Sequence, residues 1–192
     1  MFAALEMRRH DEERFFRSNI FVSFITTISY VVMALALGTA VADNGQPIYW
    51  TRWLFYIASC SILTLDIAFI AQKPIFRKVE IALFTALTMF CGFLASIIIT
   101  FDRWWFFALS TAAYIGMLFT LFKRSGDESV KSTSIMSFVM ITWSLFPVVW
   151  ILAPTGFGVF TTFIEAIFYL VLDFMTKIAF GLYISARQSI AR

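Results

Sequence analysis

The sequence predicts an all-α membrane protein built as a bundle of six transmembrane helices. Hydrophobic residues make up 60% of the 192 residues and charged residues only 14%, which leaves too little polar surface for a water-soluble domain. Six apolar stretches are also long enough to cross roughly 30 Å of bilayer hydrocarbon, which takes about 20 helical residues. We therefore expect residues 1–192 to form one transmembrane domain surrounded by lipid.

The first three spans are expected at residues 19–42, 50–72 and 79–100. The first span follows a charged N-terminal segment and ends before Asn44-Gly45, a pair that favours a turn. The second span ends before Pro74, and the third begins after the charged connection KPIFRK. Each of these breaks therefore has the residue types that end a helix.

The last three spans are expected at residues 103–122, 132–153 and 158–186. The third and fourth spans meet abruptly at the short segment FDRW, in which only Phe101 and Asp102 lie between them. The connection KRSGDESVK contains Ser125-Gly126, and the connection APTG contains Pro154. Both are typical of turns between helices.

Basic residues predict the orientation, because cytoplasmic loops carry an excess of Lys and Arg. If both termini lie on one side, only Arg52 and Arg103 fall on the opposite side. The basic residues on the first side are Arg8, Arg9, Arg14, Arg17, Lys73, Arg77, Lys78, Lys123, Arg124, Lys131, Arg187 and Arg192. We expect a multi-pass cell-membrane protein with both termini in the cytoplasm. The net charge of +3 is not gathered into a stripe, so nucleic acid is not an expected partner.

Ionisable residues inside the spans indicate a candidate site, because a charge within the bilayer is costly. Asp173 and Lys177 are four residues apart in the last span and share one helix face. A lysine kept away from water favours its neutral amine, which can condense with a carbonyl compound. The aspartate would then hold the resulting positive charge. The alternative is an ion pair that only holds helices together.

The second span carries one stripe of candidate residues along its length. These residues are Arg52, Phe55, Ser59 and Asp66. Arg52 lies at the extracellular end, and Asp66 lies about 10 Å beyond Ser59 toward the cytoplasm. Asp66 is either a proton relay or a carboxylate that reaches surface water or Lys73. Cys60 is expected to be a small buried apolar residue, and its spacing from Cys91 suggests no metal site.

Aromatic residues provide a further signal in the fifth span. Trp143, Phe146 and Trp150 share one helix face, and Pro147 can bend the helix. Such rings usually fill a core. Facing a lysine in the middle of the membrane, they could instead line an apolar pocket for a flat, rod-like polyene.

These segments resemble the microbial (type 1) rhodopsins over about residues 15–185. The matching segments are PIYWTRW, LTLDIAF, RWWFFALSTAA, WSLFPVVW and IEAIFYLVLDFMTKIAFG, in the order of the family. The last segment resembles the helix that carries the retinal lysine. The resemblance implies a rhodopsin-like bundle with all-trans-retinal as its cofactor. The family has seven helices, so its first helix is expected to be absent or truncated here.

The resemblance also implies a role for each candidate residue. Lys177 would bind retinal as a Schiff base, Asp173 would be its counterion, and Arg52 would be the extracellular gate. The residues lining the chromophore would be Tyr56, Trp143, Phe146 and Trp150. Glu165 matches one acid of the proton-release pair of outward pumps, but the loop LAPTGFG lacks the partner acid.

One position suggests the direction of transport. Phe55 stands where outward proton pumps carry the carboxylate that accepts the Schiff-base proton. Phe55, Ser59 and Asp66 resemble the Phe-Ser-acid triplet of schizorhodopsins and Antarctic rhodopsins, and Cys60 also fits that group. Schizorhodopsins usually carry glutamate where this chain has Asp66. The resemblance therefore implies a light-driven inward proton pump, with Asp66 as the cytoplasmic proton relay.

Other functions are compatible with the same residues. A photosensory rhodopsin would use the same pigment, and a light-gated channel is an alternative because channelrhodopsins also use a cysteine at the Cys60 position. A small membrane transporter or scaffold with a structural Asp–Lys pair is the non-photochemical alternative. We expect no enzymatic activity. The expected partners are the lipid bilayer, protons and further copies of the chain, as a trimer by family analogy.

Overall fold

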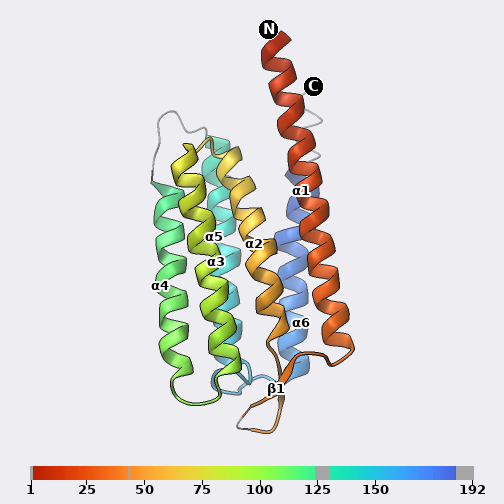
Figure 1. Cartoon of the computed structure of the whole chain (residues 1–192), viewed down its shortest axis with the longest axis vertical. Helices are drawn as coiled ribbons and strands as arrows, with labels where there is room; N and C mark the ends of the chain where they lie inside the picture. The colour runs from red at the N-terminus through yellow and green to blue at the C-terminus, as the bar shows by residue number, and fades with distance from the viewer. Residues whose placement is uncertain (1, 43, 124–129, 185–192) are drawn as a thin grey trace.

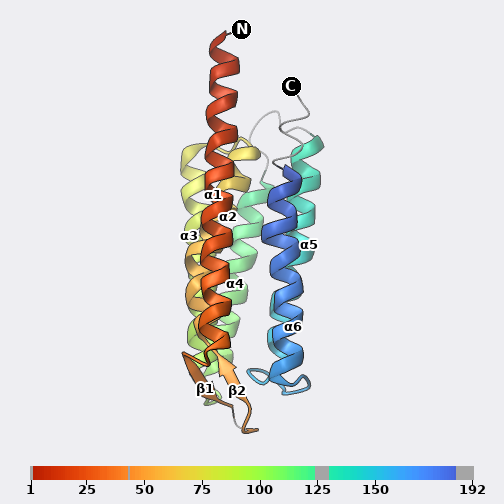
Figure 2. The same ribbon diagram turned by 90° about the vertical axis from the view of Figure 1, so that its right-hand side faces the viewer.

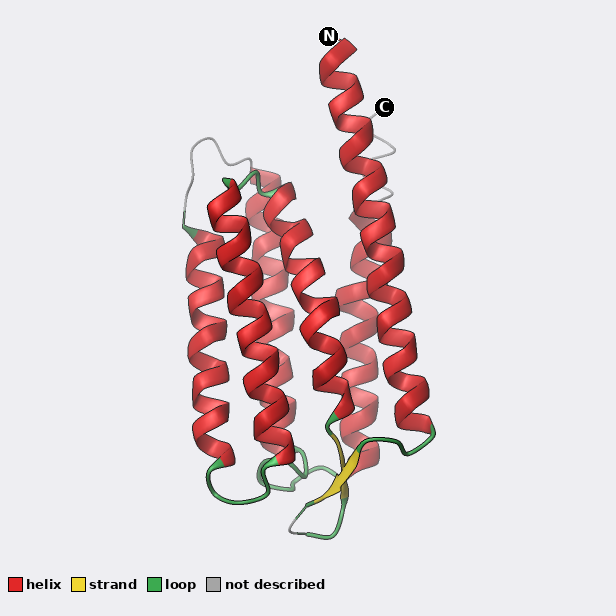
Figure 3. Ribbon diagram, viewed as in Figure 1, coloured by secondary structure: helices red, strands yellow, loops and turns green. Residues whose placement is uncertain are grey.

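The structure is a bundle of long helices aligned along one axis (Figure 1, Figure 3). The computed structural model describes residues 2–42, 44–123 and 130–184, with side chains from residue 13 onward and, in the fifth helix, from residue 134. The helices in this part are α1 (Phe2–Ala34), α2 (Thr51–Ile70), α3 (Ile75–Ile97), α4 (Arg103–Phe122), α5 (Val130–Leu152) and α6 (Thr162–Asp173). A π-helix, η1 (Phe174–Ala179), continues α6, and helical backbone extends to Ile184.

Within the described residues, six helices are long and apolar enough to cross a membrane. Large hydrophobic side chains cover the outside of the bundle, including Phe24, Leu83 and Phe119. Because helices satisfy their backbone hydrogen bonds internally, such a bundle can expose apolar side chains to hydrocarbon on every side. The predicted all-α bundle of six spans is confirmed.

Successive helices pack as neighbours, and the first helix contacts the last. The main contacts join α1 to α2, α2 to α3 and α3 to α4. Helix α5 lies beside α6 (Figure 2), and α1 packs against η1. The last helix is therefore held between α1 and α5, and its middle faces the interior of the bundle.

The first span differs most from its expected range. Helix α1 begins upstream of residue 19 and ends at Ala34, and residues 35–42 form a turn and a strand. Ala36 and Gly38 both have positive φ, at 54° and 66°, which breaks the right-handed helix. Glycine suits the second position because a Cβ there would overlap the side chain of Thr51.

A short hairpin, which the sequence did not suggest, follows this turn. Strands β1 (Thr39–Val41) and β2 (Pro47–Tyr49) pair antiparallel, with Ala40 opposite Ile48. The hairpin lies beneath the ends of α1 and α6 (Figure 1). Three residues per strand are too few to show the alternation of apolar and polar side chains that predicts a strand.

The last span begins at Thr162 rather than at residue 158, because a turn with Gly158 at a φ of 67° precedes it. Its expected end at residue 186 lies outside the described residues. Some of the basic residues used to predict the orientation also lie outside the described side chains, namely Arg8, Arg9, Arg124, Lys131, Arg187 and Arg192.

Candidate functional site

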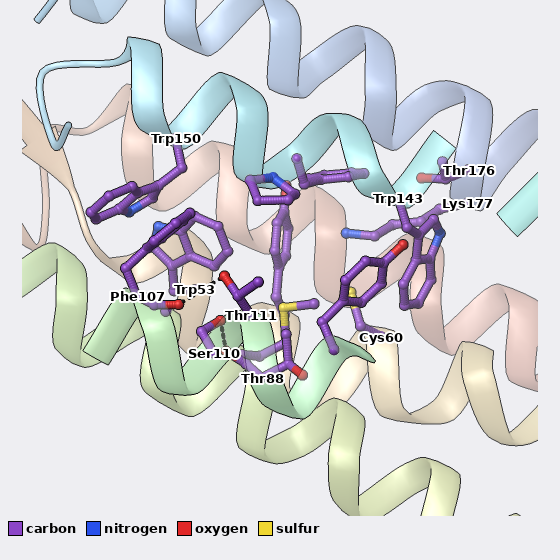
Figure 4. Close-up of a pocket in the computed structure, with 16 residues that line it drawn as sticks. Trp53, Cys60, Thr88, Phe107, Ser110, Thr111, Trp143, Trp150, Thr176 and Lys177 are labelled. Carbon is purple, nitrogen blue, oxygen red and sulfur yellow. Dashed lines mark hydrogen bonds between the residues drawn. The ribbon is translucent and has the colours of Figure 1, made fainter. Parts of the chain in front are cut away.

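A cavity lined by aromatic rings lies in the interior of the bundle. Its walls come from α2, α3, α4, α5 and the last helix. The aromatic rings that line it are Trp53, Tyr56, Phe107, Tyr114, Trp143, Phe146 and Trp150. Trp150, Phe107 and Trp53 lie toward one end, and Trp143, Cys60 and Lys177 lie toward the other (Figure 4). The predicted aromatic wall and the predicted lysine therefore meet at one cavity.

Ring contacts fix the shape of this wall. Trp150 stacks on Phe107 with ring centroids 4.5 Å apart, and its Nε1 donates a hydrogen bond of 3.2 Å to Ser96 Oγ. Tyr56 meets Phe146 edge to face with centroids 6.0 Å apart. Aromatic pairs prefer such stacked and edge-to-face arrangements, so these contacts set the positions of the rings in the wall.

The lysine that enters the cavity is paired with a carboxylate. Lys177 Nζ lies 2.7 Å from Asp173 Oδ1, and the two side chains are only 1% and 2% exposed. Nζ also lies 3.6 Å from the centre of the Tyr56 ring, a cation–π contact that stabilises an ammonium group. The predicted proximity of Asp173 and Lys177 is thus a direct ion pair.

Two tyrosines hold the other oxygen of this carboxylate. Tyr56 donates a hydrogen bond of 2.6 Å to Asp173 Oδ2, and Tyr30 donates one of 2.8 Å to the same atom. Together with the ammonium, these donors stabilise the negative charge on Asp173. Tyr30 is not among the site residues that the sequence predicts. The only sequence signal for it is a polar hydroxyl within an apolar span, which needs a partner when buried.

The lysine lies in the π-helix η1, which begins directly after Asp173. A π-helical turn contains an additional residue and occurs frequently at functional sites. Here the additional residue changes the direction in which the side chains beyond Ala179 leave the helix, relative to Asp173. The sequence pattern did not predict this turn, because apolar residues occupy almost every position around it.

A second buried ion pair lies between the first one and the hairpin end of the bundle. Arg52 Nη1 donates to Glu165 Oε1 at 3.1 Å, with side-chain exposures of 1% and 5%. The guanidinium lies over the ring of Tyr169, 4.1 Å from its centre. Glu165 lies in the first turn of α6, where the helix dipole favours an acidic residue. Among the described residues, Arg52 Nε and Glu165 Oε2 have no hydrogen-bond partner, so they can bind internal water.

The other residues of the predicted α2 stripe lie outside this cavity. Ser59 is fully buried, and its hydroxyl donates to the backbone carbonyl of Phe55 at 3.1 Å. Phe55 is half-buried and is not among the residues that line the cavity. Cys60, the next residue after Ser59, does line it and is a free cysteine.

Asp66 lies toward the opposite end of α2 from Arg52 and is 5% exposed. Its neighbours include Ser18 and Arg14 on α1. Lys73, which the sequence offered as a surface partner, donates a hydrogen bond of 2.9 Å to the Lys123 carbonyl at the end of α4. Asp66 is therefore a buried carboxylate packed against α1.

The cavity suits an elongated apolar ligand that carries an aldehyde. Aromatic rings lie along the cavity, and the amine of Lys177, which can react with an aldehyde, lies toward one end. The cavity volume is about 50 Å³, whereas sites for small molecules usually enclose at least about 300 Å³. A polyene therefore fits only if side chains move. Met89 lines the cavity, and its flexible, unbranched side chain can make room.

The chain is similar to known proteins over almost its whole length. A model of the bacteriorhodopsin-like protein family matches residues 1–188. Bacteriorhodopsin of Halobacterium salinarum is 29% identical, over 94% of this chain and 73% of that protein. Sensory rhodopsin-2 of Natronomonas pharaonis is 24% identical, over 88% and 74%. The crystal structure of schizorhodopsin 4 is 40% identical, with a TM-score of 0.86 and coverage of 95% of this chain and 90% of the other.

The contacts of Asp173 lead to a prediction about stability. Tyr30→Phe removes a hydrogen bond to a charged group with almost no change in volume, and should lower the free energy of unfolding by about 1.5–3 kcal/mol. Tyr114→Phe is the matched control, because the Tyr114 hydroxyl contacts the neutral groups Met140 O and Ser144 Oγ and should cost only about 0.5–1.5 kcal/mol. Denaturant unfolding of the purified proteins measures both. Equal losses in the two variants would contradict a charged carboxylate at this position.

Proposed function

The chain belongs to the bacteriorhodopsin-like family of microbial rhodopsins, and from that premise we propose that it is a light-driven inward proton pump that binds all-trans-retinal at Lys177. The family consists of membrane-embedded, retinal-binding ion pumps and sensors rather than classical enzymes. The observation that carries the proposal is the buried pair of Lys177 and Asp173 beside a cavity lined by rings.

In this proposal, retinal is attached to Lys177 Nζ, and the rings of Tyr56, Trp143, Phe146 and Trp150 hold it and exclude water. When bound, retinal supplies the absorption of light and an isomerisation that reorients the N–H at Nζ. Asp173 holds the positive charge at Nζ. Because this carboxylate already accepts two tyrosine hydrogen bonds, it is stabilised as an anion and is a poor acceptor for the proton.

The proton leaving Nζ therefore has to move away from Asp173. Phe55 offers no acceptor on α2, and Glu165 is neutralised by Arg52. Asp66 is the buried carboxylate toward the other end of α2. We assign to it the role of attracting or relaying the proton toward the cytoplasm, past Ser59 and Cys60. Reprotonation then comes from the side of Arg52, so the net movement is inward.

The resemblance of Phe55, Ser59 and Asp66 to the schizorhodopsin triplet supports this direction, as does the 40% identity to schizorhodopsin 4. We further propose that the chain resides in the cell membrane as a trimer, with both termini in the cytoplasm. Among the described side chains, Arg52 and Arg103 lie at the hairpin end, where α2 and α4 begin. The basic residues at the opposite end are Arg14, Arg17, Lys73, Arg77, Lys78 and Lys123. The excess of basic residues at this opposite end supports this orientation.

The direction of transport is tested by illuminating cells or vesicles that contain the protein and retinal while the external pH is recorded. With the N- and C-termini inside, light should make the medium more alkaline, and a protonophore should abolish the change. Acidification would contradict inward transport. A normal pigment that gives no pH change would favour a photosensor, the function named for the relative sensory rhodopsin-2.

The role of Asp66 is tested by Asp66→Asn. This variant keeps the shape of the side chain but removes the acid, so the initial rate of light-driven proton uptake should fall at least about tenfold while the pigment forms normally. Asp66→Glu is the control and should retain transport, because the carboxylate remains. Transport at the original rate in the asparagine variant would show that Asp66 is only a buried structural residue.

A further inference from the structure

A second hollow lies on the outer face of the bundle, between α5 and the last helix, and encloses about 410 Å³. The stacked rings of Phe138 and Phe180 contribute to its lining, with centroids 5.5 Å apart and an angle of 7° between their planes. Met175 and Ala179 of η1 line it as well. Figure 2 shows α5 and the last helix running side by side here. We call this hollow the α5–η1 groove.

The polarity of the α5–η1 groove changes along its length. Ser134, near the beginning of α5, and Tyr183, near the end of the last helix, supply hydroxyl groups. These two residues lie toward the end of the bundle where α1 begins. Met175 and Ala179 lie deeper, at the level of Lys177. The groove is therefore apolar toward the middle of the membrane and polar toward its surface.

We propose that the α5–η1 groove binds one acyl chain of a membrane phospholipid, with the headgroup region near Ser134 and Tyr183. The lining changes from apolar to polar in the same direction as a phospholipid, whose acyl chains lie in the middle of the membrane and whose headgroup lies at its surface. Met175 is 44% exposed and Tyr183 is 50% exposed, so the groove opens directly onto the bilayer. A chain bound there restores the dispersion contacts that an unfilled hollow loses, and the volume lies within the range of ligand sites.

This site would connect the bilayer to the candidate functional site. Met175 and Ala179 contact the proposed lipid, and Lys177 lies between them in the same π-helix. A bound acyl chain therefore packs against the outside of the segment whose inner side carries the buried amine. The inference rests on the membrane setting and the groove, and it does not depend on the direction of transport.

The experiment fills the groove and counts the lipids that remain bound. The full chain is placed in nanodiscs of one defined phospholipid, released into mild detergent and weighed by native mass spectrometry. The original protein should retain one phospholipid. Ala179→Phe and Met175→Trp should each reduce that retention at least tenfold, because the new rings occupy the groove. Ile115→Trp places a similar ring on the outer face of α4, where Ile115 is 59% exposed, and should leave retention unchanged.

Each other outcome overturns the proposal. The groove is not a lipid site if the original protein retains no phospholipid, or if all variants retain it equally. An equal loss in Ile115→Trp would mean that the bound lipid is a general boundary lipid. Loss of an oligomer rather than of a lipid in the groove variants would assign the groove to a second copy of the chain. Met175→Trp alone decides the result if Ala179→Phe fails to fold, because Met175 is already half exposed.

Discussion

An ammonium and a carboxylate lie in contact in the middle of a bundle that faces hydrocarbon. The arrangement of the interior follows from this pair, because each buried charge requires a partner. Separating Lys177 from Asp173 would leave a charge buried without its partner, at a cost of about 3–5 kcal/mol. Tyr30 from α1 and Tyr56 from α2 complete the environment of the carboxylate. The last helix is thereby joined to both of these helices at the level of the cavity.

The charges are distributed unevenly along the axis of the bundle. Arg52 and Glu165 neutralise each other near the hairpin, and Asp66, the one acidic residue of α2, lies toward the other end. Phe55, on the turn after Arg52, contributes no titratable group. In the proposed function Asp66 accepts or relays the proton that leaves the central pair, because Glu165 is already paired with Arg52. This asymmetry is the physical basis of the proposed direction.

Much of this arrangement could be predicted from the sequence, because length and hydrophobicity determine spans and a four-residue spacing determines a shared helix face. Spacing predicts the contact between Asp173 and Lys177. It also predicts that Trp143, Phe146 and Trp150 share the helix face that lines the cavity. Spacing does not predict the role of Tyr30, because its contact with Asp173 depends on how α1 packs against a helix far away in the chain. The π-helix and the early end of α1 depend on local backbone geometry that the hydrophobic pattern does not record.

The proposed function requires Lys177 to be the group that binds the chromophore. The most direct measurement is the visible absorption spectrum after all-trans-retinal is added to the purified protein and to its Lys177→Ala variant. We expect a visible band for the original protein, shifted well away from that of free retinal, and no such band for the variant. The same band in Lys177→Ala, or no band in either protein, would show that Lys177 does not bind retinal.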